Sequence, residues 1–398
     1  MGTLRRILLA EGFQTATIPI VAVTLALVVC WLVIALTTPA SFTGGRWNRA
    51  NEAYRKLAEG GLGVNFDPKT RAPVSVDPLP KNRRFGETAN KAALLILTGL
   101  SVAIALRAGL FNIGAEGQFI VGAITAAYFG WRLHLPPAVQ PIAVMLLAMT
   151  AAGLYGALAG ALKVWRGVHE VIGTIMLNWI AYYLVTQWLV IGPLNVRTLM
   201  GESGAPSVNE AGTPEVGASA LLWRLFDPPN RVNAGILIAA GMAILAWVFL
   251  YWTRLGYELR AVGSGPEAAR SAGIPVGRRT VMAMFIAGAL AGLAGAVYIL
   301  GTEKRYAGAA AGGYGFDGIA ISLLGANHPI GVVAAAVFIG LVRAGATALQ
   351  LPAVAIHKSF TDLLQGCIIL FVTAHYLFRW AMVRVARRIG PEEAQERV

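Results

Sequence analysis

The residues most capable of specific chemistry lie in a short glycine-rich patch, Gly109–Gln118. It holds three glycines together with Asn112, Glu116 and Gln118, inside a sequence that is otherwise apolar. An amide side chain donates and accepts hydrogen bonds, and a carboxylate accepts them or binds a cation. These residue types indicate either recognition of a polar ligand or a turn that interrupts a helix.

A second patch, Gly312–Gly318, has the same character, and Asp317 is its one charged residue. Glu116 and Asp317 are each followed by a glycine and, three residues beyond that glycine, by an isoleucine. An acid also follows each patch two apolar runs later, at Glu170 and Asp362. Paired glycine-interrupted segments in two halves of a chain indicate a site between repeats. The alternative is a chance resemblance in a chain rich in glycine and alanine.

The composition of the chain indicates that these patches lie in a membrane protein. Of the 398 residues, 56% are hydrophobic and 13% are charged, whereas soluble domains carry about 25% charged residues. This excludes a soluble enzyme, a disordered chain and a secreted disulfide scaffold. The net charge is +13, but the basic residues form no cluster interleaved with aromatic residues, so nucleic acid is not a predicted partner. Cys30 and Cys367 lie in apolar runs and are predicted to be buried without a disulfide or metal.

The apolar runs predict an all-α membrane protein, because crossing a bilayer takes about 20 apolar residues of helix. Two of the runs lie between Ala92 and Trp131 and are separated by Arg107 and the first patch. The others are Ile18–Leu36, Pro141–Leu162, Val171–Ile191, Val232–Thr253, Thr280–Gly301, Phe316–Leu324, Ile330–Leu349 and Leu363–Phe378. They give nine or ten crossings, ten if the short run Phe316–Leu324 counts. The pairs Gly156/Gly160 and Gly288/Gly292 are typical of close helix packing.

Irregular backbone at membrane depth is tolerated only where it is buried in protein or lines a cavity. The first patch is therefore predicted to be a broken helix on a substrate path. The alternative is a cytosolic turn in which Glu116 is solvated or pairs with Arg107. The substrate-path candidates are Asn112, Glu116, Gln118, Glu170, Asn178, Asp317, Asn327 and Arg343.

Two of these candidates have explicit alternatives. Arg343 lies in the middle of an apolar run, where an isolated charge is costly. It is predicted either to form an ion pair with Asp317 or Asp362, or to contact substrate. Asn178 is predicted to make a helix–helix hydrogen bond in preference to a ligand contact.

Basic residues near the ends of the runs indicate the orientation. With ten crossings, the groups near Arg5, Lys163, Arg260 and Arg384 all fall on the cytosolic side, together with both termini. The loop before Lys91 disagrees, since it is external yet strongly basic, but long loops weigh less in this rule. We therefore expect one membrane domain over residues 1–398, with external loops 37–90 and 192–231 and a cytosolic loop 254–280.

The cytosolic loop contains a predicted short helix. Pro266 and Glu267 suit its first turn, Arg270 suits its last turn, and Gly273 suits the stop. A helix of two turns is marginal alone and needs a surface on which to pack. We interpret it as a docking element for a soluble partner; the alternative is an interfacial connector.

Two enzymatic motifs are missing from the sequence. No Gly-x-x-x-x-Gly-Lys-Ser/Thr occurs, so ATP cannot be bound through a P-loop of this chain. His169-Glu170 is not followed by the second histidine of a zinc protease. We therefore expect no catalytic residue, metal or cofactor here, and any ATP must be used by another subunit.

Four motifs resemble those of a known family. They are Asn112–Gln118, His169–Asn178, Arg260–Ile274 and Gly315–Ala320. From Lys91 to Leu377 the chain resembles the inner-membrane permease subunits of bacterial ABC importers for nucleosides. These belong to a larger group that also serves simple sugars and branched-chain amino acids. The stretch Ala326–Pro329 departs from the more basic sequence of such permeases, which puts a role for His328 in doubt.

The resemblance implies a type II-like importer with about ten helices per permease. It also implies a second, usually different, permease, a cytosolic ATPase and an external binding protein or lipoprotein. By the same resemblance, the segment that contacts the ATPase comprises Arg260, Gly263, Pro266, Glu267, Ala268, Arg270 and Gly273.

The predicted function is thus nucleoside import across the bacterial cell membrane by alternating access. Within the importer class, simple sugars or branched-chain amino acids are the alternative cargo. The alternative from another class is an ion-coupled secondary transporter that uses Glu116, Glu170, Asp317 or Asp362 as its ion site.

Overall fold

The computed structural model describes residues 11–37, 45–66, 73–76, 82–200, 212–307 and 312–349, with Leu363, Gly366, Cys367, Leu370 and Phe371. Most of the predicted last span and the candidate Asp362 lie outside the described residues. The chain divides into two compact units. One is Glu59–Ala344, and the other joins Met1–Ala58 to Gly345–Val398.

The terminal unit is built on α2 (Glu11–Thr37), which contains the predicted first span, and on most of α3 (Arg46–Leu62). Polar contacts join the two helices. The Trp31 indole donates to Asn51 at 2.9 Å, and the Tyr54 hydroxyl donates to the Leu27 carbonyl at 2.6 Å. The rings of Trp31 and Trp47 stack with centroids 5.0 Å apart. The predicted loop 37–90 therefore contains helical structure that the sequence analysis did not anticipate.

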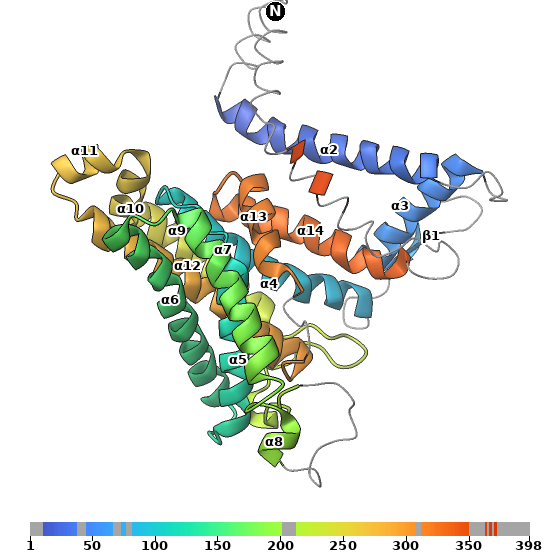
Figure 1. The fold of residues 1–398 in the computed structure, drawn as a ribbon. Helices are drawn as coiled ribbons and strands as arrows, with labels where there is room; N and C mark the ends of the chain where they lie inside the picture. The colour runs from blue at the N-terminus through green and yellow to red at the C-terminus, as the bar shows by residue number, and fades with distance from the viewer. Residues whose placement is uncertain are drawn as a thin grey trace, which may run out of the picture. The chain divides into compact units, whose positions relative to one another are not determined.

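The larger unit is a helical bundle with a small hairpin of β1 (Val64–Phe66) and β2 (Pro73–Val76), paired antiparallel. Its helices up to the second patch are α4 (Arg83–Arg107), α5 (Ala115–Arg132), α6 (Gln140–Arg166), α7 (Glu170–Tyr182), α8 (Val196–Met200), α9 (Gly235–Trp252), α10 (Arg254–Ser264), α11 (Pro266–Ser271) and α12 (Val276–Tyr298) (Figure 1). They are followed by α13 (Tyr314–Leu324) and α14 (Pro329–Leu349), whose last residues belong to the terminal unit.

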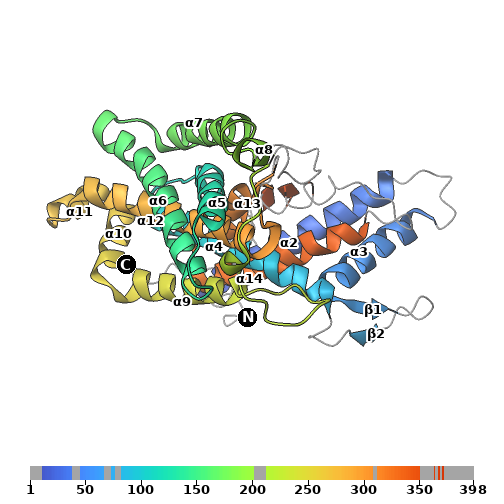
Figure 2. The ribbon, with the colours of Figure 1, turned by 90° about the horizontal axis from the view of Figure 1, so that it is seen from below.

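Helix α12 lies at the centre of this bundle and packs against α4, α5 and α6 (Figure 2). Its crossing with α6 depends on small residues. A Cβ built on Gly156 would lie 2.4 Å from the Met284 carbonyl oxygen, and one on Gly288 would lie 2.4 Å from that of Ala152. The prediction of close packing at the two glycine pairs is confirmed. Small residues let helix backbones approach where lipid supplies no hydrophobic driving force between helices.

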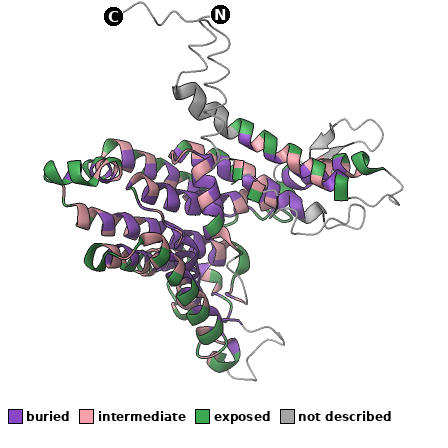
Figure 3. Cartoon of the chain, turned by 45° about the horizontal axis from the view of Figure 1, so that its top comes forward, coloured by how far each residue is buried: buried purple, intermediate pink, exposed green. Residues whose placement is uncertain are grey.

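Six helices among the described residues are long and apolar enough to cross a membrane: Ile20–Thr37, Arg83–Arg107, Gln140–Arg166, Gly235–Trp252, Val276–Glu303 and Pro329–Ala346. Helices α5 and α7 and the short α13 add further apolar segments. Large apolar side chains on the outer faces of α6, α7 and α9 are exposed, and the interior is buried (Figure 3). This is the arrangement expected of an all-α polytopic membrane protein.

The two ends of the larger unit differ. One end carries α10 and α11, and the other carries α8 and the segment 212–235 (Figure 1). That segment forms backbone hydrogen bonds with residues 300–306, including Leu222 N–H to the Leu300 carbonyl at 3.0 Å. Two of the long helices also finish in π-helical turns at this second end, Tyr183–Leu189 and Ile299–Glu303.

Candidate functional site

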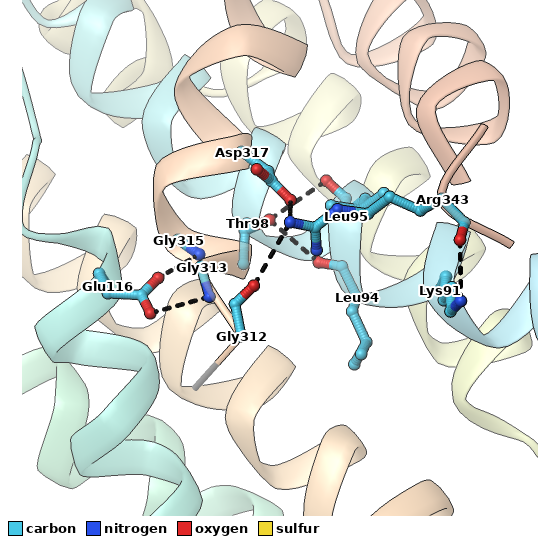
Figure 4. A network of polar contacts seen from close by, with 10 residues as sticks. All are labelled: Lys91, Leu94, Leu95, Thr98, Glu116, Gly312, Gly313, Gly315, Asp317 and Arg343. Carbon is cyan, nitrogen blue, oxygen red and sulfur yellow. Dashed lines mark hydrogen bonds and ion pairs between the residues drawn. The ribbon is translucent and has the colours of Figure 1, made fainter. Parts of the chain in front are cut away.

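The first patch places Glu116 in the first turn of α5, and its carboxylate caps a different helix. The backbone N–H of Gly313 donates to Glu116 Oε1 at 3.2 Å, and that of Gly315 donates to Oε2 at 2.7 Å (Figure 4). Gly313 is the N-cap of α13 and offers no side-chain cap of its own. Because the first N–H groups of a helix have no intrahelical acceptor, Glu116 supplies what α13 lacks.

Helix α5, which carries Glu116, is itself capped by another helix. Its N-cap residue, Gly114, makes no side-chain cap hydrogen bond. Asn178 of α7 supplies one, since its Oδ1 accepts from the Gly117 N–H at 2.8 Å and its Nδ2 donates to the Ile113 carbonyl at 2.9 Å. The prediction of a helix–helix hydrogen bond for Asn178 is confirmed.

Residues of the second patch bind to Arg343 of α14. Arg343 pairs with Asp317, with Nη2 and Oδ2 2.5 Å apart, and donates to the Gly312 carbonyl at 3.3 Å. Its guanidinium lies 4.9 Å from the centre of the Tyr314 ring. Of the alternatives for Arg343, the structure contains the ion pair with Asp317 (Figure 4). We call the groups on Asn178, Glu116, Asp317 and Arg343 the capping network.

Glycine is required where α5 meets α13. A Cβ on Gly315 would lie 2.2 Å from the backbone nitrogen of Glu116, and a Cβ on Gly117 would lie 2.9 Å from Asn178 Oδ1. The N-termini of α5 and α13 approach closely because Gly315 lacks a side chain, and the absence of one at Gly117 leaves room for Asn178 of α7. Both patches therefore precede helix starts, and these two helix starts lie against each other. A site between repeats, which the comparison of the two halves indicated, stays a prediction.

Other candidates of the first patch are buried beside this contact. Asn112 and Gln118 form two reciprocal amide hydrogen bonds, at 2.9 and 3.2 Å. Glu116 does not pair with Arg107, whose guanidinium donates instead to the Asn327 carbonyl at 2.8 Å. The alternative of a turn in which Glu116 is solvated or pairs with Arg107 was wrong, because Glu116 is buried and accepts from α13.

Two candidates lie away from the capping network. Glu170 begins α7 and pairs with Lys163 at 2.8 Å across the turn that joins α6 to α7. Asn327 has a left-handed backbone, with φ of 55°, and its Oδ1 accepts from the Ser322 hydroxyl at 2.9 Å. Neither has a contact with Glu116 among those of the described residues.

The predicted helix of the cytosolic loop is confirmed as α11. Pro266 is its first residue, Glu267 and Arg270 pair at 3.1 Å, and Gly273 follows with φ of 81°. Pro266, Glu267, Ala268 and Arg270 are exposed, and Ala269 faces inward. Helix α11 thus presents a small polar surface to its surroundings.

The preceding helix α10 was not predicted, and it connects α11 to the first patch. A Cβ on Gly263 would lie 2.2 Å from the Arg107 carbonyl oxygen and 2.8 Å from the Gly109 nitrogen. The end of α10 thus rests directly on the backbone turn between α4 and α5. Gly263, a coupling candidate, faces the bundle rather than the exposed surface of α11.

A buried carboxylate fixes α10 to α12. Glu258 lies between Arg279, 2.5 Å from its Oε2, and Arg254, 3.0 Å from its Oε1. Burial by itself raises the pKa of the Glu258 carboxyl, but hydrogen bonds from Arg279 and Arg254 outweigh it and hold the pKa below its usual range. The sequence analysis missed Glu258, although the spacing of Arg254 and Glu258 is that of a helical ion pair.

The remaining coupling candidate, Arg260, joins α10 to the end of α9. It donates to the Leu250 carbonyl at 3.0 Å and lies over the Tyr251 ring at 5.0 Å. The His328 ring also packs against the Tyr251 ring, with ring centroids 5.4 Å apart. Among the described residues, no group of three His, Cys, Asp or Glu side chains could hold a metal ion.

Taken together, interrupted helices interlock inside an apolar bundle, and an exposed helix at one end is linked to them through backbone contacts. Residues 85–373 match the family described as the branched-chain amino acid transport system permease component. The chain belongs to this family of transport permeases.

Relatives of known description agree with this assignment. A guanosine ABC transporter permease of Bacillus subtilis is 36% identical over 76% of this chain and 84% of its own length. A glucose ABC transporter permease of Haloferax volcanii is 32% identical over 83% and 87%. A nucleoside ABC transporter permease of Lactococcus lactis is 30% identical over 81% and 87%. No solved structure matches the chain significantly.

Proposed function

We propose that this permease moves nucleosides into the cytosol as part of an ATP-driven importer. The observation that carries the proposal is the continuous contact from the exposed helix α11, through Gly263 and Gly109, to the interlocked N-termini of α5 and α13. The cargo class is supported by the guanosine and nucleoside permeases among the relatives.

The importer requires three partners in this proposal. An ATPase subunit docks on α11 and supplies the hydrolysis for which the sequence offers no P-loop. A second permease completes the pore, and Bacillus subtilis has two related guanosine permeases, 36% and 29% identical to this chain. An external binding protein or lipoprotein delivers the substrate. The end that carries α11 faces the cytosol, in agreement with its arginines.

The proposed cycle uses the contacts of the larger unit in order. Closure of the ATPase displaces α11, and the Glu258 ion pairs make α10 move together with the start of α12. The backbone contact at Gly263 passes the movement to the turn before α5. Because Glu116 holds the start of α13, α5 and α13 then move as a pair or separate by exchanging the Glu116 hydrogen bonds.

The same mechanism also suits a different cargo. The glucose permease among the relatives supports a sugar as the second candidate cargo. An ion-coupled transporter is supported less, because the carboxylates of Glu116 and Asp317 already have protein partners.

Reconstitution tests the proposed function. Vesicles that contain the permease pair, its ATPase and ATP should accumulate adenosine when the loaded binding protein is present, and ionophores should have no effect. Accumulation by the permease alone under a sodium or proton gradient would overturn the proposal. Binding of adenosine, ribose and leucine to the partner lipoprotein identifies the cargo class.

A further inference from the structure

A cavity of about 450 Å³ lies in the larger unit and is not part of the capping network. Its walls come from the first turns of α4, from the segment 212–235 and from the π-helical turn Ile299–Glu303. It therefore lies at the end of the unit opposite α11, and its size is within the range of small-molecule sites, about 300–1,000 Å³. π-Helical turns are frequent at functional sites.

The aromatic part of the lining comes from Tyr298 and Tyr314. Their ring centroids are 5.7 Å apart and the rings are inclined by 54°. Phe119 supports both from the interior, at 5.6 Å from Tyr298 and 5.8 Å from Tyr314. Such rings offer a flat ligand a rigid face on which to stack.

The polar part of the lining contains both negatively and positively charged side chains. The carboxylates are Glu87 and Glu303, and the cations are Lys91, Arg224, Arg231 and Lys304. Lys91 is already held, since it donates to the Arg343 carbonyl at 3.1 Å. Carboxylates accept hydrogen bonds from hydroxyl groups, and cations donate to carbonyl oxygens and ring nitrogens.

The cavity also touches the capping network. Tyr314 is the first residue of α13, whose N-terminus Glu116 caps, and Arg343 lies over the Tyr314 ring. A ligand against Tyr314 would thus lie next to the interlocked helices that the proposed cycle moves.

We propose that this cavity is an outward-facing nucleoside site, in which the base stacks on Tyr298, beside Tyr314, and the ribose hydroxyls bond to Glu303 and Glu87. The inference rests on the proposed function and locates its substrate. A nucleoside fits this lining because it combines an aromatic face with several hydroxyl groups.

Thiol protection in the assembled importer tests the site without transport. Thr302 is exposed in the cavity wall, so Thr302→Cys, with Cys30 and Cys367 replaced by alanine, should react with a membrane-impermeant thiol reagent. Saturating adenosine should slow this reaction at least fivefold, and ribose should not. Absence of protection, or stronger protection by adenosine monophosphate, would overturn the proposal.

Uptake kinetics give an independent readout. Tyr298→Leu should raise the KM for adenosine about tenfold, since stacking of a base on an aromatic ring is worth about 1–3 kcal/mol. Tyr298→Phe, which keeps the ring, should raise KM about twofold, and Glu303→Gln should raise it as well. The exposed Glu215 lies outside the cavity lining, so Glu215→Gln is the matched control and should leave KM unchanged.

The two proposals fail in different ways. If the importer takes up adenosine normally while Tyr298→Leu and Glu303→Gln leave KM unchanged, the cavity site is wrong and the proposed function stands. If the assembled importer takes up no nucleoside, the proposed function itself is wrong.

Discussion

At the scale of single residues, the larger unit satisfies its helix ends with side chains from other helices. Asn178 serves α5, and Glu116 serves α13. A carboxylate at a helix N-terminus is favoured both by the free N–H groups and by the helix dipole. Helix capping therefore explains the buried Glu116, and ion pairs with arginines explain the buried Asp317 and Glu258. Their presence does not by itself indicate an ion site.

Replacing Glu116 tests the cap. Glu116→Ala should leave two buried N–H groups without an acceptor, which costs about 1–3 kcal/mol for each. Glu116→Gln keeps one acceptor oxygen and should lose less. Thermal unfolding of the detergent-purified permease should place the two variants in that order below the native chain. Equal Tm values for Glu116→Ala and for the exposed control Glu215→Ala would contradict the cap.

The Glu258 carboxyl predicts a pH dependence. Because its pKa is lower in the folded chain than the ordinary value of 4.5, its stabilising contribution is complete above that value and is lost as the pH falls through the lower, folded pKa. The Tm difference between the native chain and Glu258→Gln should therefore be constant near neutral pH and shrink below about pH 4.5. A difference that persists unchanged into the acid range would contradict the ion pairs.

At the scale of elements, α10 shows why part of the structure could not be predicted. It contains Gly256 and Gly263, and each glycine lowers helix propensity by about 1 kcal/mol. The sequence therefore favours a loop. In the structure α10 lies so close to the end of α9 that a Cβ at Gly256 would be 1.9 Å from the Phe249 carbonyl oxygen, so only glycine permits that approach. The same glycine that weakens the local helix signal is thus required by a tertiary contact. The local signals of α11, by contrast, were sufficient, since Pro266 and Gly273 mark its two ends.

Gly263 and Gly265 form a matched pair for testing the contact of α10 with the first patch. Gly263→Ala should lower Tm and reduce coupled uptake several-fold, because its new methyl group would meet the Arg107 carbonyl oxygen at 2.2 Å. At Gly265 the nearest atom is 3.8 Å away and the backbone is extended, so Gly265→Ala should behave as the native chain. If both variants transport normally, this contact does not carry the movement.

Helix α11 can be tested without disturbing the bundle. Glu267 and Arg270 are exposed, and surface ion pairs contribute about 0–1 kcal/mol, so alanine at both positions should leave Tm nearly unchanged. The double variant should nevertheless reduce the adenosine imported per ATP hydrolysed by the assembled complex. Arg166→Ala, an exposed arginine of another connection, is the control. Unchanged coupling in the double variant would exclude α11 as the docking element.

At the scale of the whole molecule, local patterns predicted the apolar helices of an all-α membrane protein, but they did not predict the long-range contacts. The runs around Arg107 became α4 and α5, and the short run became α13. The sequence also indicated that the two glycine-rich patches resemble each other, since each has an acid followed by a glycine and then an isoleucine. It could not indicate that Glu116 bonds to Gly315, because 199 positions separate them and no local signal records the pairing.

The two ends of the larger unit should be energetically coupled. In the proposed route, Gly263 acts on α13 only through α5 and Glu116. Combining Gly263→Ala with Glu116→Gln should therefore reduce the uptake rate by less than the product of the two single effects. Replacing the first change by Gly265→Ala should give simple multiplicative behaviour. Independent effects in the first pair would exclude a shared route.

The separation of Glu116 from its partner amides also has a consequence for biosynthesis. During translation, residue 116 enters the bilayer nearly 200 residues before the N–H groups of Gly313 and Gly315 exist. The nascent chain must hold the Glu116 carboxylate without its final N–H donors for that interval, an expensive arrangement in hydrocarbon. Maturation of α5 is therefore expected to wait for the second half of the polypeptide, and a ribosome-stalled fragment that ends before Gly312 should be a preferred target of membrane quality-control proteases.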